Sequence, residues 1–114
     1  MPVTTQEDGM LATVFVDGAL DSQTGSALDG STRTVMDKGH RRLLVNLQKT
    51  KQANSAGLES LVKIASQVTA VGGRLALVGP PPLLLDILRA TRLERRFAVF
   101  ESTEQAMQNL RMES

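Results

Sequence analysis

A strand–helix–strand pattern in the middle of the chain limits the fold more than any other feature. A short apolar run over 43–47 is followed by a segment of helical periodicity over 55–71 and a second apolar run over 74–78. Around a helical wheel, the apolar residues of the middle segment fall within about 80° of Leu61. They are Gly57, Leu58, Ile64, Ala65, Val68 and Val71. Because parallel strands need such a crossover connection, the pattern predicts a parallel β-α-β unit.

The flanking segments extend this pattern to the rest of the chain. Residues 3–6 and 10–16 are predicted strands, and Glu7-Asp8-Gly9 between them favours a hairpin. Asp17-Gly18 is expected to end the second strand. The other predicted elements are a helix that begins after Asp21-Ser22 and runs to Lys38, helices from 80–82 onwards and over 102–111, and a strand over 97–100. We therefore predict a single α/β domain over 1–114, in which about four helices accompany a mixed sheet of an N-terminal hairpin plus parallel strands.

The composition removes several classes of function. The 13 Lys and Arg residues nearly balance 12 Asp and Glu residues, so no bulk field favours nucleic acid or an anionic membrane. The absence of cysteine excludes thiol catalysis, and a single histidine argues against a transition-metal site. No glycine pattern typical of phosphate-binding loops occurs, and we expect no metal and no cofactor. Since neither a secretion signal nor a membrane-spanning stretch is visible, we expect a cytoplasmic protein.

A serine is predicted at the junction between the central strand and its helix, within Asn54-Ser55-Ala56-Gly57-Leu58. As a helix cap, Ser55 or Asn54 would accept a hydrogen bond from a first-turn amide. As a nucleophile, Ser55 would need a positioned base. As a phosphoacceptor, it would need only exposure and a partner that senses the added charge. The wheel places Ser55 on the polar side with Glu59, so its hydroxyl is expected to be accessible.

The only histidine, His40, is the available base for a serine nucleophile. It lies in a basic cluster with Lys38, Arg41 and Arg42, which is expected to be a solvated turn. The sequence around Ser55 is also not the Gly-x-Ser-x-Gly elbow of α/β-hydrolases. A hydrolase is therefore the least favoured of the three alternatives.

Several segments together resemble the STAS domain of bacterial anti-sigma factor antagonists. In chain order they are Gly18-Ala19-Leu20-Asp21, 44–47 with 54–58, Gly72-Gly73 with 75–78, Pro81-Pro82-Leu83 to Leu93, 97–100 and 102–106. The resemblance implies a STAS-like fold and a protein that binds an anti-sigma factor of the histidine-kinase-like ATPase class, thereby freeing a sigma factor. It implies a binding protein and not an enzyme. It further implies that the partner phosphorylates Ser55, which breaks the complex, and that a phosphatase restores it.

The sequence departs from the family motif at Asn54, where an acidic residue usually precedes the phosphoserine. An amide can cap the helix and hydrogen-bond to a phosphate, but it cannot act as a base. The alternative is therefore a STAS subunit of a stress-signalling scaffold or of a lipid-transport ATPase complex, in which the same surface binds a partner without a phosphate cycle.

The predicted partner-binding residues lie mainly around the serine. They are Asn54, Gly57, Leu58, Glu59, Lys51 and Leu85. Lys51 is predicted in a loop just before Ser55, where it can pair with a phosphate or with carboxylates of the partner. On the third predicted helix, leucine and isoleucine side chains cover an arc of about 200°, which is wider than a core-facing stripe needs. Two interpretations are open: the helix lies deeply buried between its neighbours, or part of its leucine surface stays exposed and Leu85 is an apolar anchor for a protein partner.

Overall fold

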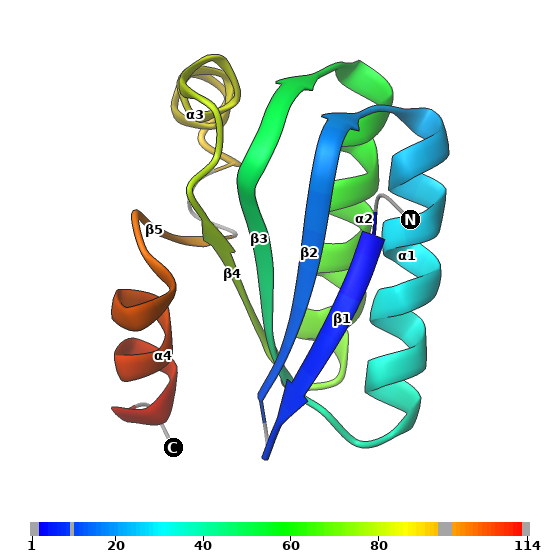
Figure 1. The fold of residues 1–114 in the computed structure, drawn as a ribbon, viewed down its shortest axis with the longest axis vertical. Helices are drawn as coiled ribbons and strands as arrows, with labels where there is room; N and C mark the ends of the chain where they lie inside the picture. The colour runs from blue at the N-terminus through cyan, green and yellow to red at the C-terminus, as the bar shows by residue number, and fades with distance from the viewer. Residues whose placement is uncertain (1–2, 10, 94–96, 113–114) are drawn as a thin grey trace.

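The computed structural model describes residues 3–9, 11–93 and 97–112 (Figure 1). Its strands are β1 (Val3–Asp8), β2 (Leu11–Leu20), β3 (Arg42–Ala53), β4 (Arg74–Val78) and β5 (Ala98–Phe100). Its helices are α1 (Ser22–Asp37), α2 (Ser55–Ala70), α3 (Pro82–Ala90) and α4 (Thr103–Met112). Met10, where the second strand was predicted to begin, lies outside the described residues.

The five strands form one sheet in the order β1-β2-β3-β4-β5. β1 and β2 pair as an antiparallel hairpin, and each later strand is parallel to the one before it. Helices α1, α2 and α3 connect successive parallel strands, since such strands cannot be joined by a tight turn. The predicted α/β fold, with a hairpin plus parallel strands, is confirmed.

The sheet separates two apolar clusters. On one face, Leu28 of α1 and Leu61 of α2 are fully buried against β2 and β3, and Leu84 of α3 joins the same cluster. On the other face, Ala106 and Leu110 of α4 pack against β3 and β4 (Figure 1). This arrangement puts the first turns of α1 and α2 side by side at the edge of the sheet formed by the carboxyl ends of β2 and β3.

Strands β2 and β3 are longer than predicted. β2 continues through Asp17-Gly18 to Leu20, because Gly18 adopts a φ of 99° and the pairing register shifts on both sides of it. β3 continues to Ala53, and the buried Thr50 hydroxyl donates a 3.0 Å hydrogen bond to the Val16 carbonyl. The prediction that Lys51 lies in a loop is therefore wrong. Lys51 is an exposed residue of β3.

The wheel prediction for α2 is confirmed over most of the helix. Gly57, Leu61, Ile64, Ala65 and Val68 are buried. Leu58 is half-buried against the core cluster, and Glu59 is exposed. Val71 departs from the prediction because it is the C-cap residue, outside the regular helix, and 49% of its surface is exposed.

The predicted solvated turn at the basic cluster holds for Lys38 and Arg41, which are exposed, but not for His40, and Lys38 and His40 together form a clamp that joins β1 to the end of α1. His40 is only 8% exposed, and its Nε2 lies 2.7 Å from Glu7 Oε1. Lys38 Nζ donates to the other oxygen of Glu7 at 3.1 Å, and Arg41 donates to the Met36 carbonyl. The prediction failed because Glu7 is remote in sequence, so its pairing depends on the tertiary fold.

This clamp predicts an acid-dependent loss of stability. Hydrogen bonds from Lys38 and His40 lower the pKa of Glu7 below 4.5 in the folded state. A lowered folded-state pKa stabilises the fold above the unfolded-state pKa, and this contribution is lost as the pH falls through the folded-state pKa. We expect a Glu7→Gln variant to lose less stability than wild type between neutral pH and pH of about 3 in urea unfolding. Glu59→Gln, which removes an exposed carboxylate of α2, is the matched control; equal pH profiles for all three proteins would contradict the clamp.

Candidate functional site

Ser55 is the first residue of α2 and directly follows the N-cap residue Asn54. Asn54 Oδ1 accepts a hydrogen bond from the backbone amide of Gly57 at 3.0 Å. The side chain of Asn54, and not that of Ser55, therefore caps the helix. Ser55 is exposed, and its hydroxyl has no hydrogen-bond partner among the residues that the structure describes. Of the three alternatives for this serine, capping is therefore taken by its neighbour.

Gly57 fixes the position of this junction against β2. A Cβ atom on Gly57 would collide with the carbonyl oxygen of Leu20, the last residue of β2. The same oxygen accepts a 3.1 Å hydrogen bond from the Asn54 amide. Gly57 is buried by this contact. It therefore positions α2 against β2 and does not form part of the exposed surface of the site.

A second strand-to-helix junction lies beside the first. Leu20 and Ala53 are paired in register at the ends of β2 and β3, so Asp21 and Asn54 follow neighbouring positions (Figure 1). Asp21 Oδ1 accepts a 2.9 Å hydrogen bond from the Thr24 amide and caps α1. That backbone hydrogen bond lowers the pKa of Asp21, which keeps the carboxylate ionised at neutral pH. The edge thus presents one anionic cap and one neutral cap side by side.

The other predicted partner-binding residues are more scattered. Lys51 is exposed near the end of β3, four positions before Ser55. Leu85 is half-buried and lines a groove between α3 and β5 with Arg89 and Val99; no residue of α2 lines this groove. The exposed leucine of α3 is Leu83, with 68% of its surface accessible. Of the two alternatives for this helix, leucine surface does stay exposed, but at Leu83 and not at the predicted anchor Leu85, which is half-buried.

The structure removes the proposed base of a serine hydrolase. His40 lies before the start of β3 and Ser55 lies after its end, so the 12-residue strand separates them. His40 is also bound to Glu7. No other histidine occurs in the sequence. Ser55 therefore has no imidazole base within this chain.

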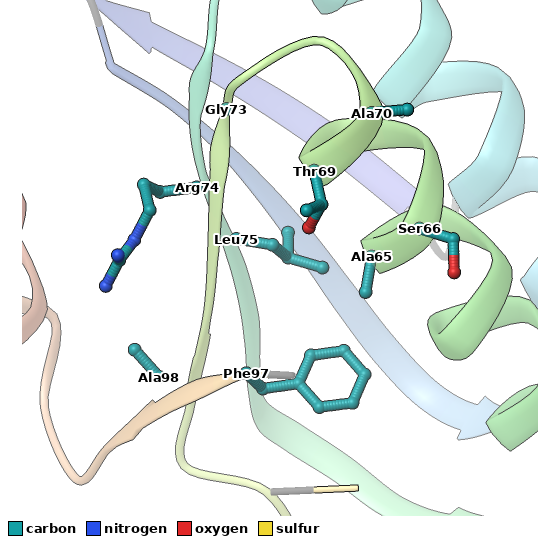
Figure 2. A pocket seen from close by; sticks show the side chains of 9 residues that line it. All are labelled: Ala65, Ser66, Thr69, Ala70, Gly73, Arg74, Leu75, Phe97 and Ala98. Carbon is teal, nitrogen blue, oxygen red and sulfur yellow. The ribbon is translucent and has the colours of Figure 1, made fainter. Parts of the chain in front are cut away.

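Ser55 also lies outside the cavity at the far end of its helix. A hollow of about 640 Å³ is formed by the C-terminal half of α2, the start of β4 and the start of β5 (Figure 2). Thr69, Leu75 and Phe97 line it, and Ser55 does not. Within residues 3–9, 11–93 and 97–112, no group of three or more acidic or histidine side chains is arranged to hold a metal ion, and no helix is long and apolar enough to cross a membrane. The chemistry available at Ser55 is that of an exposed hydroxyl at a capped helix start.

A family model described as the STAS domain matches residues 1–106. The chain belongs to the STAS domain family. BtrV of Bordetella bronchiseptica, named a candidate anti-sigma factor antagonist, is 29% identical over 99 residues, which cover 87% of this chain and 84% of BtrV. A Thermotoga maritima protein of the same designation is 26% identical over 76 residues, 67% of each chain.

Solved structures share the STAS fold. A crystal structure of a candidate anti-sigma factor antagonist from Thermotoga maritima superposes with a TM-score of 0.87 at 19% identity, covering 96% of this chain and 94% of that one. The anti-sigma factor antagonist SpoIIAA in its unphosphorylated form gives 0.77 at 17% identity, covering 96% and 97%. Phosphorylated SpoIIAA from Bacillus gives 0.77 at 16% identity, covering 95% and 98%. The predicted STAS-like fold is confirmed.

Sequence reasoning gave no role to Asp21 in the site of this STAS domain. In the sequence, Asp21 marks the start of the first predicted helix and belongs to the segment Gly18-Ala19-Leu20-Asp21. The pairing of β2 with β3 is what brings it beside Asn54. The one available signal was the repeated order of a capping residue followed by serine, at Asp21-Ser22 and Asn54-Ser55.

Proposed function

We propose that this STAS domain is an anti-sigma factor antagonist that is switched by phosphorylation of Ser55. The observation that carries the proposal is the exposed, unbonded Ser55 hydroxyl on a helix start that Asn54 already caps. The names of relatives support it, since BtrV is named a candidate antagonist and SpoIIAA is known in phosphorylated and unphosphorylated forms. The protein acts in the cytoplasm as a single domain over 1–114, and it binds a partner and does not catalyse a reaction.

The partner is an anti-sigma factor that is also a serine kinase of the histidine-kinase-like ATPase class. The Ser55 oxygen forms a bond to the γ-phosphorus of ATP, ADP leaves, and the hydroxyl proton passes to a base of the kinase, because the Asn54 amide cannot accept it. A phosphatase transfers the phosphoryl group to water and regenerates the hydroxyl.

The switch is electrostatic. A phosphate adds about −1.5 to −2 charges. It joins the carboxylate of Asp21 and that of Glu59, which is exposed one turn along α2. A partner surface that fits the neutral serine then meets concentrated negative charge, and the complex dissociates.

The partner-binding surface consists of exposed residues around the serine and an apolar flank. Asn54, Glu59 and Lys51 supply its polar contacts, and Leu58 supplies a half-buried apolar edge. Gly57 contributes by holding the helix against β2. Leu85 belongs to this surface only if the partner extends over the groove between α3 and β5.

One observation favours the alternative function. Asn54 replaces the acidic residue of the family motif, and a STAS subunit of a stress-signalling scaffold or lipid-transport ATPase complex needs no phosphorylated serine. Such a subunit would present the same surface in a permanent complex. The identity of the captured partner distinguishes the two functions.

The proposal is tested by affinity capture from the host followed by phosphorylation of the purified pair. We expect capture of a kinase-like ATPase, and, after addition of ATP, one phosphoryl group on a peptide that contains Ser55. Ser55→Ala is the control and should lack that modification. Capture of a transport ATPase or scaffold, with an unmodified Ser55 peptide, would establish the alternative.

A further inference from the structure

Phe15 lies on a partly uncovered face of the sheet and packs into neither core cluster. Its neighbours Val14 and Val16 point into the cluster under α1 and α2, so Phe15 faces the side that carries α4. There α4 packs against β3, β4 and β5, and none of the four described helices covers the part of this face nearer β1 (Figure 1). The ring is half-buried and, among the described residues, belongs to neither apolar cluster. The packing of the fold therefore does not explain an aromatic side chain at this position.

A recess surrounds this ring. Phe15 pairs in register with Asn46, and Asp17 pairs with Lys49, so one residue of β2 lies opposite two residues of β3. Such a β-bulge bends and twists a strand locally. The recess has a volume of about 370 Å³, and besides Phe15 it is lined by Thr4, Val16, Asp17, Asn46, Gln48 and Lys49. Because sites for small molecules have volumes of roughly 300–1,000 Å³, the recess can hold one small molecule.

The two charged side chains of the recess are unpaired. Asp17 and Lys49 are exposed and in register on neighbouring strands, yet neither side chain makes an ion pair or a hydrogen bond with any residue that the structure describes. The Asn46 amide, in contrast, is occupied, because it accepts from the Gln48 backbone at 2.9 Å and donates to Thr103 at 3.3 Å. The charges that a ligand can reach are therefore one carboxylate and one ammonium group.

This combination selects a ligand with two opposite charges and an apolar group. An α-amino acid carries its ammonium and its carboxylate on one carbon, which suits charged groups on adjacent strands about 4.8 Å apart. Its ammonium can pair with Asp17 and its carboxylate with Lys49, while its side chain contacts the ring of Phe15. A ligand with a single charge can pair with only one of these two residues.

We propose that this recess binds a free α-amino acid with an apolar side chain. The site is separate from the surface around the phosphoacceptor, since neither Asn54 nor Ser55 lines the recess. The proposal therefore goes beyond the switch at Ser55 and does not depend on it.

Titration of the nitrogen-15-labelled protein with L-phenylalanine, followed by NMR, tests the proposal. We expect the amide signals of residues 15–17 and 46–49 to shift at millimolar ligand, and L-leucine should shift the same signals. Phenylpropionate lacks the ammonium group and phenethylamine lacks the carboxylate. Each should bind at least about tenfold more weakly than L-phenylalanine, because each loses a charge-assisted hydrogen bond.

Substitutions of the two charged residues should act selectively. Asp17→Asn should lower the affinity for L-phenylalanine about tenfold and leave that for phenylpropionate unchanged. Lys49→Gln should also lower the affinity for L-phenylalanine and leave that for phenethylamine unchanged. Lys51→Gln is the matched control and should bind L-phenylalanine like wild type, because Lys51 is exposed on the same strand and does not line the recess.

Three results would overturn the proposal. They are unchanged spectra with both amino acids, equal affinities for L-phenylalanine and its two single-charge analogues, and an equal loss of affinity in the Lys51 variant. The dispersion of the amide signals of each variant distinguishes a lost ligand contact from a lost fold. None of these results bears on the phosphorylation of Ser55, so the proposed function is judged separately.

Discussion

Replacing Gly57 with alanine should lower the free energy of unfolding by about 3 kcal/mol and the melting temperature by about 15 °C. The added Cβ would meet the Leu20 carbonyl oxygen and carbon, which are backbone atoms at the end of a paired strand and cannot rotate away. Either α2 moves away from β2 or the strand end distorts. Both changes also weaken the hydrogen bond from the Asn54 amide to Leu20.

Gly30→Ala is the matched control for this prediction. Gly30 is an exposed residue in the middle of α1, and no atom lies within 4 Å of the position that its Cβ would occupy. Alanine at this position should stabilise the helix by about 0.5–1 kcal/mol, because glycine is the poorer helix former. Urea and thermal unfolding, followed by circular dichroism, measure both variants. A Gly57→Ala protein as stable as wild type would show that the junction yields easily.

Ser55→Glu should weaken binding to the anti-sigma partner by at least about 100-fold, because like charges placed in an interface cost several kcal/mol. The substitution places a negative charge at the exposed start of α2, beside Asp21 and Glu59. The stability of the free protein should change by no more than about 0.5 kcal/mol, as for other surface substitutions. Isothermal titration calorimetry and urea unfolding report the two quantities separately.

The control for charge is Ser55→Gln, which adds a side chain of nearly the same size without ionisation. Its affinity should fall much less than that of Ser55→Glu, and the difference should shrink as salt is raised. Equal losses for both variants would show that bulk and not charge breaks the complex, and the electrostatic account of the switch would have to be abandoned.

Local sequence signals predicted the elements of the fold better than their lengths. Apolar periodicity located α2 and the parallel strands around it, because a helix that buries one face repeats its apolar residues at helical spacing within a short stretch of sequence. The ends of β2 and β3 were missed because Gly18 bends inside a strand and Thr50 is fixed by a carbonyl of the neighbouring strand. His40 was placed in solvent for the same reason: its partner, Glu7, is distant in the chain.

For the site, the sequence could identify the exposed serine but not the surroundings that tertiary structure assembles. The exposure of Ser55 and the capping role of Asn54 follow from local rules. The closeness of Asp21 follows only from strand register, and the placement of Leu85 against β5 only from helix packing. Periodicity marks the apolar side of α3, but it cannot say which leucine the neighbours leave uncovered.

The single carbonyl of Leu20, which receives the Asn54 amide and leaves no room for a side chain on Gly57, has a consequence for deep mutational scanning. A selection that counts surviving cells would deplete substitutions at both Gly57 and Ser55, so survival alone could not distinguish the two positions. Scored in parallel for protein abundance, they should separate: Gly57 variants disappear from the abundance pool, whereas Ser55 variants persist in it. Codon 57 thus provides an internal standard against which depletion at codon 55 can be assigned to signalling.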